Sequence, residues 1–294
     1  MTSGRNLSTA ALTGLAPAVW GSTYLVTTEL LPPDRPLLAT TMRALPGGLF
    51  LVALGRRLPA GIWWWRALAL GVLNIGAFNV LLFVAAYRLP GGIAAVIMSA
   101  QPVFVVALAA LFLGERVRGR HALACGLGAG GVGLLVFKGS VSPDGVGVLA
   151  ALGGALCMAS GITLTKRWGR PGGVGLLTFT GWQLTAGGLV LLPFWLSLED
   201  LPDGLTGSNA VGFTYLITLG AVLSYMVWFR GIERLPATAV SFLALGSPVV
   251  ATLLGYLFKD QTLSVLQLLG IAVIFLAVTL GQPQSPRRKP ALTP

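Results

Sequence analysis

The amino-acid sequence repeats itself, 146 residues apart, within a chain that is apolar along most of its length. Arg88-Leu89-Pro90 returns as Arg234-Leu235-Pro236, and Pro102-Val103 returns as Pro248-Val249 at the same spacing. Such self-similarity at a fixed offset indicates an internal duplication. In a membrane protein, an internal duplication is typical of transporters whose substrate site lies between the two copies.

A second match extends the duplication toward the N-terminus. Arg43 lines up with Gln183 at an offset of 140 residues, and each precedes a Gly-Gly-Leu triplet by the same spacing. The chain is therefore predicted to consist of two related units, residues 1–140 and residues 141–282. The polar, proline-rich end of the chain, residues 283–294, is predicted to be a disordered cytoplasmic tail.

Composition indicates that the background is a membrane protein. Of the 294 residues, 55% are hydrophobic and 10% are charged, and the mean hydropathy is +0.82. Soluble domains carry roughly 25% charged residues, and a helix needs about 20 apolar residues to cross a bilayer. We predict an all-α integral membrane protein with ten transmembrane helices, five in each unit. The predicted helices lie at about residues 8–28, 36–54, 66–87, 92–113, 120–138, 145–165, 174–196, 209–230, 237–258 and 263–281.

The net charge of +11 is distributed unevenly between the two sides of the predicted membrane. Four of the 20 Lys and Arg residues fall on one side, and Arg43 lies inside a helix. The other fifteen fall on the side of the N-terminus, the even-numbered loops and the C-terminus: Arg5, Arg56, Arg57, Arg66, Arg116, Arg118, Arg120, Lys166, Arg167, Arg170, Arg230, Arg234, Arg287, Arg288 and Lys289. Because cytoplasmic loops are enriched in Lys and Arg, we expect both termini in the cytoplasm. The same distribution argues against a nucleic-acid partner.

An odd number of helices in each unit gives the duplication a definite geometry. A five-helix unit that starts in the cytoplasm ends outside, so the second unit starts outside and has the opposite orientation. The units are thus predicted to be inverted repeats related by a pseudo-two-fold axis in the membrane plane. Inward-open and outward-open conformations are then near-equivalent packings of the same parts.

Arg43 is the one charged residue near the middle of a predicted helix. An arginine at the bilayer centre costs about 2.5 to 3.5 kcal/mol on insertion scales, so it needs a compensating role. It either clamps the carboxylate of a substrate or braces the structure through backbone carbonyls or a neighbouring Asn or Gln. Its repeat counterpart Gln183 is uncharged, which indicates a shared hydrogen-bonding role for the two positions.

The 146-residue offset also pairs Gln101 with Ser247, each of which directly precedes a proline. A proline inside a helix removes an i→i−4 hydrogen bond and permits a kink. A kink near the midplane can expose backbone groups to a ligand. We therefore predict that Pro102 and Pro248 act as hinges beside a substrate site; the alternative is that both prolines only shape the packing.

Aromatic and hydroxyl side chains lie at helical spacing on one face of the first predicted helix, Trp20 and Tyr24 among them. The offset further pairs Asn79 with Tyr225, and Trp182 offers additional aromatic surface. These features favour a cavity for an amphipathic solute. The predicted substrate-binding residues are Trp20, Tyr24, Arg43, Asn79, Gln101, Trp182, Gln183, Tyr225 and Ser247.

Groups for catalysis or metal binding are scarce in the sequence. The single histidine, His121, lies at a membrane boundary, and the predicted helices contain no paired carboxylates. We expect no enzyme activity, no catalytic residues, no bound metal and no cofactor. The missing mid-membrane acid favours facilitated transport, or coupling through an edge group such as Glu29. A single cationic contact fits a zwitterionic or neutral amphipathic solute better than a dianion.

Four short motifs stand out along the first unit: Trp20-Gly21-Ser22 in the first helix, Arg43 in the second, Pro102-Val103 in the fourth, and Leu113-Gly114-Glu115-Arg116 leading into the glycines of the fifth. Together they resemble the EamA-type repeat of the drug/metabolite transporter superfamily. The resemblance covers residues 9–281 in two copies. It implies ten helices, cytoplasmic termini and a central cavity formed mainly by helices other than the fifth and tenth.

Within that superfamily, the overall pattern is most similar to bacterial amino acid exporters, including those for aromatic amino acids. We therefore expect an exporter that moves amino acids or related amphipathic metabolites out of the cytoplasm by alternating access, as a monomer in the lipid bilayer of a bacterial inner membrane. The alternatives are a broad drug or metabolite exporter and, from other classes, a membrane-embedded enzyme or a lipid flippase.

Glu115 marks the place where the two units differ. The position 146 residues later is Gln261, so the glutamate is not doubled. We expect Glu115 to pair with nearby arginines at the cytoplasmic end of the fourth helix, and not to form half of a symmetric ion site.

Overall fold

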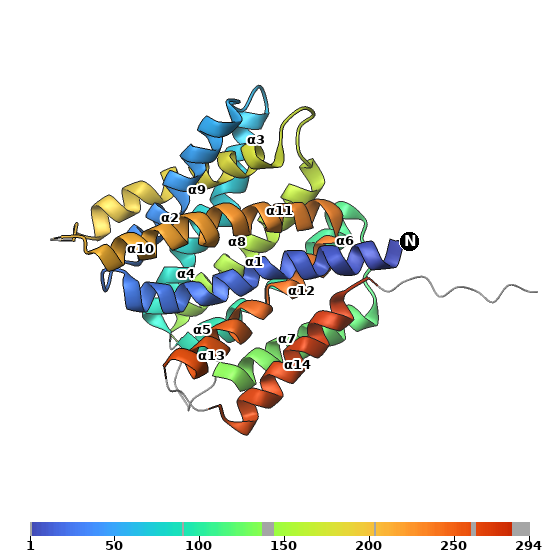
Figure 1. Cartoon of the computed structure of the whole chain (residues 1–294). Coiled ribbons are helices and arrows are strands. Elements are labelled where there is room, and N and C mark those ends of the chain that lie inside the picture. Colours follow the sequence, from blue (N-terminus) through green and yellow to red (C-terminus); the bar gives the residue numbers. More distant parts are fainter. Residues whose placement is uncertain (1, 90, 137–143, 203, 260–262, 284–294) are drawn as a thin grey trace, which may run out of the picture.

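The computed structural model describes residues 2–89, 91–136, 144–202, 204–259 and 263–283. Within these residues the chain forms ten helical rods joined by short connections (Figure 1). We number the rods as spans one to ten. Nearly all of the predicted tail, from residue 284 onward, lies outside the described residues, as does Gln261.

Five rods make up the first half of the chain, and two of them are interrupted. The third span combines two α-helices with a π-helical segment between them, and the fourth consists of two helices separated by a turn. The elements are α1 (Thr2–Leu30), α2 (Pro36–Gly55), α3 (Trp63–Gly71), η1 (Val72–Gly76), α4 (Ala77–Arg88), α5 (Gly91–Met98), α6 (Gln101–Leu113) and α7 (Gly119–Val136).

The second half repeats this pattern, interruptions included. The eighth span carries a π-helical segment in its middle, and the ninth is split by a turn. The elements are α8 (Gly145–Trp168), α9 (Leu176–Leu198), α10 (Gly207–Tyr215), η2 (Leu216–Leu223), α11 (Ser224–Arg234), α12 (Ala237–Leu243), α13 (Gly246–Phe258) and α14 (Val265–Gly281).

Most of the rods satisfy the requirements of a membrane span by length and hydropathy alone. Among the described residues, seven do so with at least 18 residues, and α14 is a shorter apolar helix. The rods α1 and α7 fall outside this set, because hydroxyl residues and glycines lower the hydropathy of α1, and glycines, Arg120 and His121 lower that of α7. The seven are Pro36–Gly55, Trp63–Ala86, Ala94–Leu113, Gly145–Trp168, Leu176–Leu198, Gly207–Arg234 and Ala237–Phe258.

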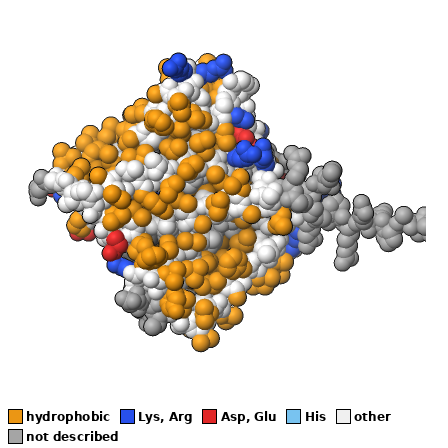
Figure 2. Space-filling model, in the orientation of Figure 1, with side chains coloured by type: hydrophobic (Ala, Val, Ile, Leu, Met, Phe, Trp, Pro, Cys, Tyr) orange, Lys and Arg blue, Asp and Glu red, His pale blue; other side chains and the backbone are white. Residues whose placement is uncertain are grey.

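The outer surface of the bundle is apolar, as lipid contact requires. Large hydrophobic side chains such as Leu111 and Val265 are 74% and 81% exposed. Figure 2 shows hydrophobic side chains over most of the visible face, with most of the Lys and Arg in view at its upper and right edges. The start of α1 and the end of α14 lie on the same side of the molecule (Figure 1). We refer to this side as the terminal side.

The helix contacts follow the predicted two-fold relation between the halves. In the first half, α1 packs against α11 and α13; in the second, its counterpart α8 packs against α4 and α6. The second and seventh spans, α2 and α9, pack on each other, and so do the fifth and tenth, α7 and α14. The fold is therefore an all-α membrane bundle of two inverted five-helix repeats.

Glycines let the second and seventh spans approach closely. A Cβ on Gly48 would lie 2.4 Å from the backbone nitrogen of Thr185, and a Cβ on Gly188 would lie 2.7 Å from the Cβ of Leu45. Without a hydrophobic driving force between helices in lipid, such close backbone packing is a main source of helix association.

The bends of the fourth and ninth spans precede the prolines and are not centred on them. The chain turns at Ser99–Ala100 and at Ala244–Leu245, and α6 and α13 begin directly afterwards. Pro102 and Pro248 therefore lie in the first turn of a new helix. Backbone N–H groups in a first turn have no acceptor within the helix, so the N–H that proline lacks costs no helical hydrogen bond. The expected mechanism, a kink caused by a proline within a continuous helix, is corrected: each span is broken ahead of its proline.

Candidate functional site

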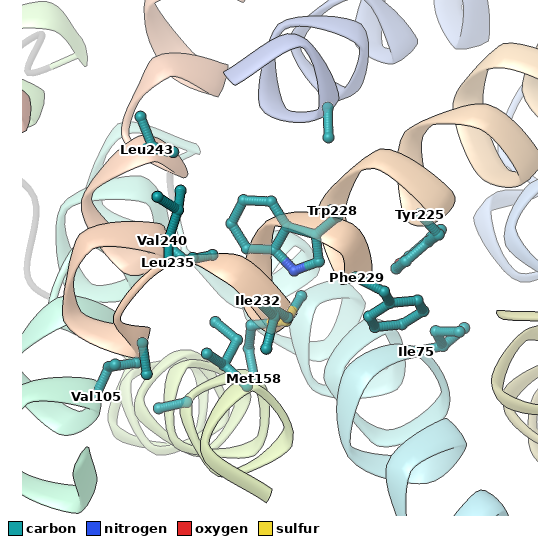
Figure 3. Packing of buried hydrophobic residues seen from close by; sticks show 14 of the residues in the cluster. Ile75, Val105, Met158, Tyr225, Trp228, Phe229, Ile232, Leu235, Val240 and Leu243 are labelled. Atoms are coloured by element: carbon teal, nitrogen blue, oxygen red, sulfur yellow. The ribbon is translucent and has the colours of Figure 1, made fainter. Parts of the chain in front are cut away.

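Aromatic side chains from the first and eighth spans meet inside the bundle. The ring centroids of Trp20 and Tyr225 are 5.2 Å apart, those of Trp20 and Trp228 are 5.1 Å apart, and those of Tyr225 and Phe229 are 5.7 Å apart. Trp228 lies in the middle of the buried cluster, between Tyr225 and Phe229 on one side and Val240 on the other (Figure 3). We call Trp20, Tyr225, Trp228 and Phe229 the aromatic cluster.

The spacing of these residues explains why they share one place. Tyr225, Trp228 and Phe229 are separated by three and four residues, so an α-helix presents them on one face. The exposed fractions of Tyr225, Trp228 and Phe229 are 5%, 1% and 0%, whereas Trp20 is partly exposed. The cluster thus offers flat apolar surface from which water is largely excluded.

A chain of hydrogen bonds ties the aromatic cluster to Arg43 of the second span. The indole Nε1 of Trp20 donates to Ser224 Oγ at 2.9 Å, and Ser224 Oγ donates to the Gly220 carbonyl at 2.7 Å. Arg43 donates to the same carbonyl from Nε at 3.1 Å and from Nη2 at 2.8 Å. Its guanidinium carbon also lies 5.9 Å from the Tyr225 ring centroid, within cation–π range. The one mid-helix cation therefore lies beside the aromatic cluster.

The carbonyl that receives these bonds belongs to a π-helical segment, η2. A π-helical turn departs from the i→i−4 pattern and is frequent at functional sites. The segment in the first half, η1 at Val72–Gly76, corresponds by the 146-residue offset to residues 218–222, which lie inside η2. Both halves therefore carry a π-helical segment at the same place, and Gly220 is the counterpart of Asn74.

The matching contact in the other half uses Gln183 and Asn74. Asn74 Nδ2 donates to Gln183 Oε1 at 2.9 Å and to Thr165 Oγ1 at 3.2 Å. Arg43 and Gln183 thus occupy equivalent positions, and each is hydrogen-bonded to the π-helical segment of the opposite half. In this conformation Arg43 acts as a brace, and the shared hydrogen-bonding role expected for the two positions is present in the geometry.

Two predicted site residues lie in structural contacts away from the aromatic cluster. Gln183 has no exposed surface and is enclosed by its contact with Asn74. Trp182 donates from Nε1 to the Arg57 carbonyl at 2.9 Å and packs against Trp63. Both side chains are held between helices away from the aromatic cluster, so we remove them from the candidate site; Gln183 Nε2 nevertheless lacks a hydrogen-bond partner among the described residues, as Gln101 Nε2 does.

The remaining predicted residues are placed differently from one another. Asn79 donates to the Ile75 carbonyl of its own helix at 2.6 Å. Ser247 is the second residue of α13. A Cβ on Gly21 would lie 2.5 Å from the Ser247 carbonyl, so α1 packs directly on this residue. Gln101 is unlike these two, since its Nε2 is buried without a hydrogen-bond partner among the described residues. The side chain of Tyr24 lies outside the described part of the chain.

Ser224 and Gly220 were missed by sequence reasoning. A serine in an apolar helix is most simply read as bonded to its own backbone, and a carbonyl carries no residue-type signal. The offset of 146 residues matches Gly220 to Asn74, but it identifies Gly220 as the partner of Arg43 only once the contact between Asn74 and Gln183 is known. Within the described residues, no group of three or more His, Cys, Asp or Glu lies close enough to hold a metal ion.

Known proteins resemble this chain over nearly its whole length. Residues 8–137 and 145–280 each match the EamA-like transporter family. The protein PecM of Dickeya dadantii is 48% identical over 267 residues, which cover 91% of this chain and 90% of PecM. An uncharacterized inner membrane transporter of Escherichia coli (strain K12), YedA, is 31% identical and covers 94% of this chain and 92% of its own length.

Solved structures share the fold, among them a crystal structure of a protein. It superposes with a TM-score of 0.76 over 93% of this chain and 97% of that chain, at 22% sequence identity. Together with the two family matches and the duplicated bundle, these similarities identify the protein: the chain belongs to the EamA-like transporter family of the drug/metabolite transporter superfamily and is a multi-pass membrane transporter.

Proposed function

We propose that this protein exports amino acids or related amphipathic metabolites from the cytoplasm across a bacterial inner membrane. Both termini lie in the cytoplasm, and transport proceeds by alternating access between the two inverted repeats. The observation that carries the proposal is the aromatic cluster with Arg43 at its edge, where side chains from both halves meet.

The chemistry of that place fits a solute with one anionic group and an apolar body. A guanidinium hydrogen-bonds carboxylates bidentately, and the faces and edges of Trp20 and Tyr225 suit an aromatic or aliphatic side chain. We propose that a substrate carboxylate replaces the Gly220 carbonyl as the acceptor for Arg43. The carbonyl keeps its hydrogen bond from Ser224, so the exchange leaves no buried carbonyl unpaired.

Gln101 is the second proposed contact. Its buried, unpartnered Nε2 is a donor that a substrate carboxylate or hydroxyl can satisfy. Tyr24, Asn79 and Ser247 stay predicted contacts, and Pro102 and Pro248 stay predicted hinges. Discontinuous helices near the midplane are typical of transporter substrate sites, which supports a site beside the turns at Ser99–Ala100 and Ala244–Leu245.

The test is counterflow in proteoliposomes that contain the purified protein. Vesicles are loaded with a panel of unlabelled amino acids, and uptake of the labelled form is followed with and without a pH gradient. We expect saturable counterflow of at least one large apolar amino acid and none of a dianionic phosphate ester. If no amino acid moves, the proposal fails, and movement of a lipophilic cation such as ethidium then identifies a broad drug exporter. An unchanged rate on imposing the gradient supports facilitated transport, and accumulation driven by the gradient shows coupling.

A further inference from the structure

The corner between the eighth and ninth spans, residues 233–238, is held from the first half by the carboxylate of Glu115. Oε1 of Glu115 accepts a hydrogen bond from the backbone nitrogen of Ala237 at 2.7 Å. Oε2 accepts from the backbone nitrogen of Thr238 at 3.2 Å and from Thr238 Oγ1 at 2.8 Å. The expectation that Glu115 pairs with nearby arginines is therefore corrected: its described partners are the first residues of α12, whose N–H groups have no acceptor within the helix.

Lys166, at the end of α8, holds the other side of the same corner. Its Nζ donates to the Glu233 carbonyl at 3.0 Å and to the Leu235 carbonyl at 2.8 Å. Arg170 adds a salt bridge to the Glu233 carboxylate, with 3.0 Å between Nε and Oε1. Charge-assisted hydrogen bonds of this kind are roughly twice as strong as neutral ones. An anionic and a cationic side chain together thus fix a short stretch of backbone.

A cavity of about 640 Å³ opens at this corner on the terminal side. Glu115 and Lys166 line it, together with Leu235, Pro236 and the end of the fourth span at Phe112 and Leu113. Leu235 is also buried against the core that contains Val105, Val240 and Trp228 (Figure 3). The corner therefore lies between an open cavity and the packed core that contains Trp228 of the aromatic cluster.

The opposite side of the molecule has its own contact between the halves. Glu29, at the end of α1, forms a salt bridge with Lys259, at the end of α13. Alternating access must release the contacts between the moving spans on one side of the membrane while those on the other side are kept. Glu115 and the Glu29–Lys259 pair join the same two halves at opposite ends, so they have opposite effects on the direction of opening.

We infer that Glu115 and Lys166 are positioning residues for transport: they hold the corner between the eighth and ninth spans as a gate between the terminal-side cavity and the substrate path. This inference rests on the transport role proposed above. Glu115 is replaced by the neutral Gln261 at the equivalent place in the second half. The second half therefore has no carboxylate equivalent to Glu115. The contact of Glu115 with Ala237 and Thr238 favours conformations that are closed on the terminal side.

Thiol labelling tests the gate without any substrate. In a background with Cys125→Ala and Cys157→Ala, the reporter is Val105→Cys, whose parent side chain has no exposed surface. A membrane-impermeant thiol reagent is applied from the terminal side, and the labelling rate is measured. Glu115→Ala and Lys166→Met should each raise this rate on the order of tenfold, because each removes two or three charge-assisted hydrogen bonds. Lys166→Arg should restore most of the slow rate, and Arg116→Gln, at an exposed neighbouring position, should leave it unchanged.

A second variant separates a gate from a general loosening of the bundle. Glu29→Gln weakens the contact on the opposite side, so the gate predicts a lower labelling rate of Val105→Cys. Simple destabilisation predicts a higher rate for both Glu115→Ala and Glu29→Gln. The gate is refuted if Glu115→Ala and the milder Glu115→Gln both label at the parental rate, or if Glu29→Gln raises the rate. If the labelling rates change as expected in these variants but no amino acid shows counterflow, the gate is retained and only the proposed substrate is overturned.

Discussion

At the scale of single residues, positions that the repeat makes equivalent form hydrogen bonds of opposite direction. Arg43 and Gln183 both reach the π-helical segment of the opposite half, but Arg43 donates to a carbonyl and Gln183 accepts from Asn74. The repeat offset predicted that the two share a hydrogen-bonding role. It could not predict the partner of Arg43, because any residue can supply a backbone carbonyl and only the fold decides which one lies within reach.

The double role of Arg43, as a brace in this conformation and as a proposed ligand, can be separated by kinetics. Arg43→Lys keeps the charge but cannot donate in a planar fork, so we expect the KM for the exported amino acid to rise about tenfold. A brace without a ligand role predicts a lower melting temperature and an unchanged KM. Arg66→Lys is the matched control, since Arg66 also stacks on aromatic rings, those of Trp63 and Trp168, away from the aromatic cluster.

Two glutamines offer a contrast between structure and function. Gln183→Leu removes one of the two acceptors of the buried Asn74 Nδ2 and leaves Thr165 Oγ1 as the other, which should cost about 0.5–1.5 kcal/mol of stability. Gln101→Leu removes a buried donor that has no partner among the described residues, so stability should be retained while transport falls. Thermal unfolding in detergent and counterflow in vesicles measure the two effects. A large loss of stability in Gln101→Leu would refute the assignment of Gln101 to the substrate.

At the scale of helices, hydropathy located the spans well and their interruptions poorly. The second span was expected at residues 36–54 and runs from Pro36 to Gly55. The fourth was expected as one helix over residues 92–113, yet the chain turns at Ser99–Ala100. The π-helical segments were not predicted at all. Hydropathy averages over about 20 residues, so it is insensitive to the backbone hydrogen-bonding pattern within one turn.

Close packing of the second and seventh spans yields a prediction about this element pair. Gly48→Val places a side chain 2.4 Å from the backbone nitrogen of Thr185, and backbone cannot move aside as a side chain can. We expect a loss of at least about 1–3 kcal/mol, seen as a lower melting temperature and poor recovery of the folded protein. Gly126→Ala is the control, because a Cβ there has no neighbour within 4 Å. It should leave stability unchanged or raise it by about 0.5–1 kcal/mol.

At the scale of the whole molecule, the contacts divide the bundle into a frame and a moving part. The second and seventh spans are packed through glycines and tied at both ends: Glu199 accepts from the backbone nitrogens of Leu37 and Leu38, and Arg57 donates to the Gly173 carbonyl. The first, fourth, sixth, eighth and ninth spans carry the aromatic cluster, the turns and the gate, with Lys166 in the sixth. Alternating access is therefore expected to move these spans against a frame that stays intact.

Whether the Glu115 gate faces the cytoplasm depends on which side of the membrane holds the two termini of the chain. The start of α1 and the end of α14 lie on the terminal side, where the Glu115 corner is bordered by the exposed cations Arg116, Arg167 and Arg234. Positive charge in short loops remains on the cytoplasmic side during insertion, so a fluorescent protein fused to either terminus should fluoresce in a bacterial host. Alkaline phosphatase fused at the same places should be inactive, because it folds only outside the cytoplasm. Fused after residue 202, in the connection that follows α9, the phosphatase should be active. The reverse pattern would place the Glu115 gate on the outer face of the membrane. The same protein would then be oriented for import, and the proposed direction of transport would be wrong.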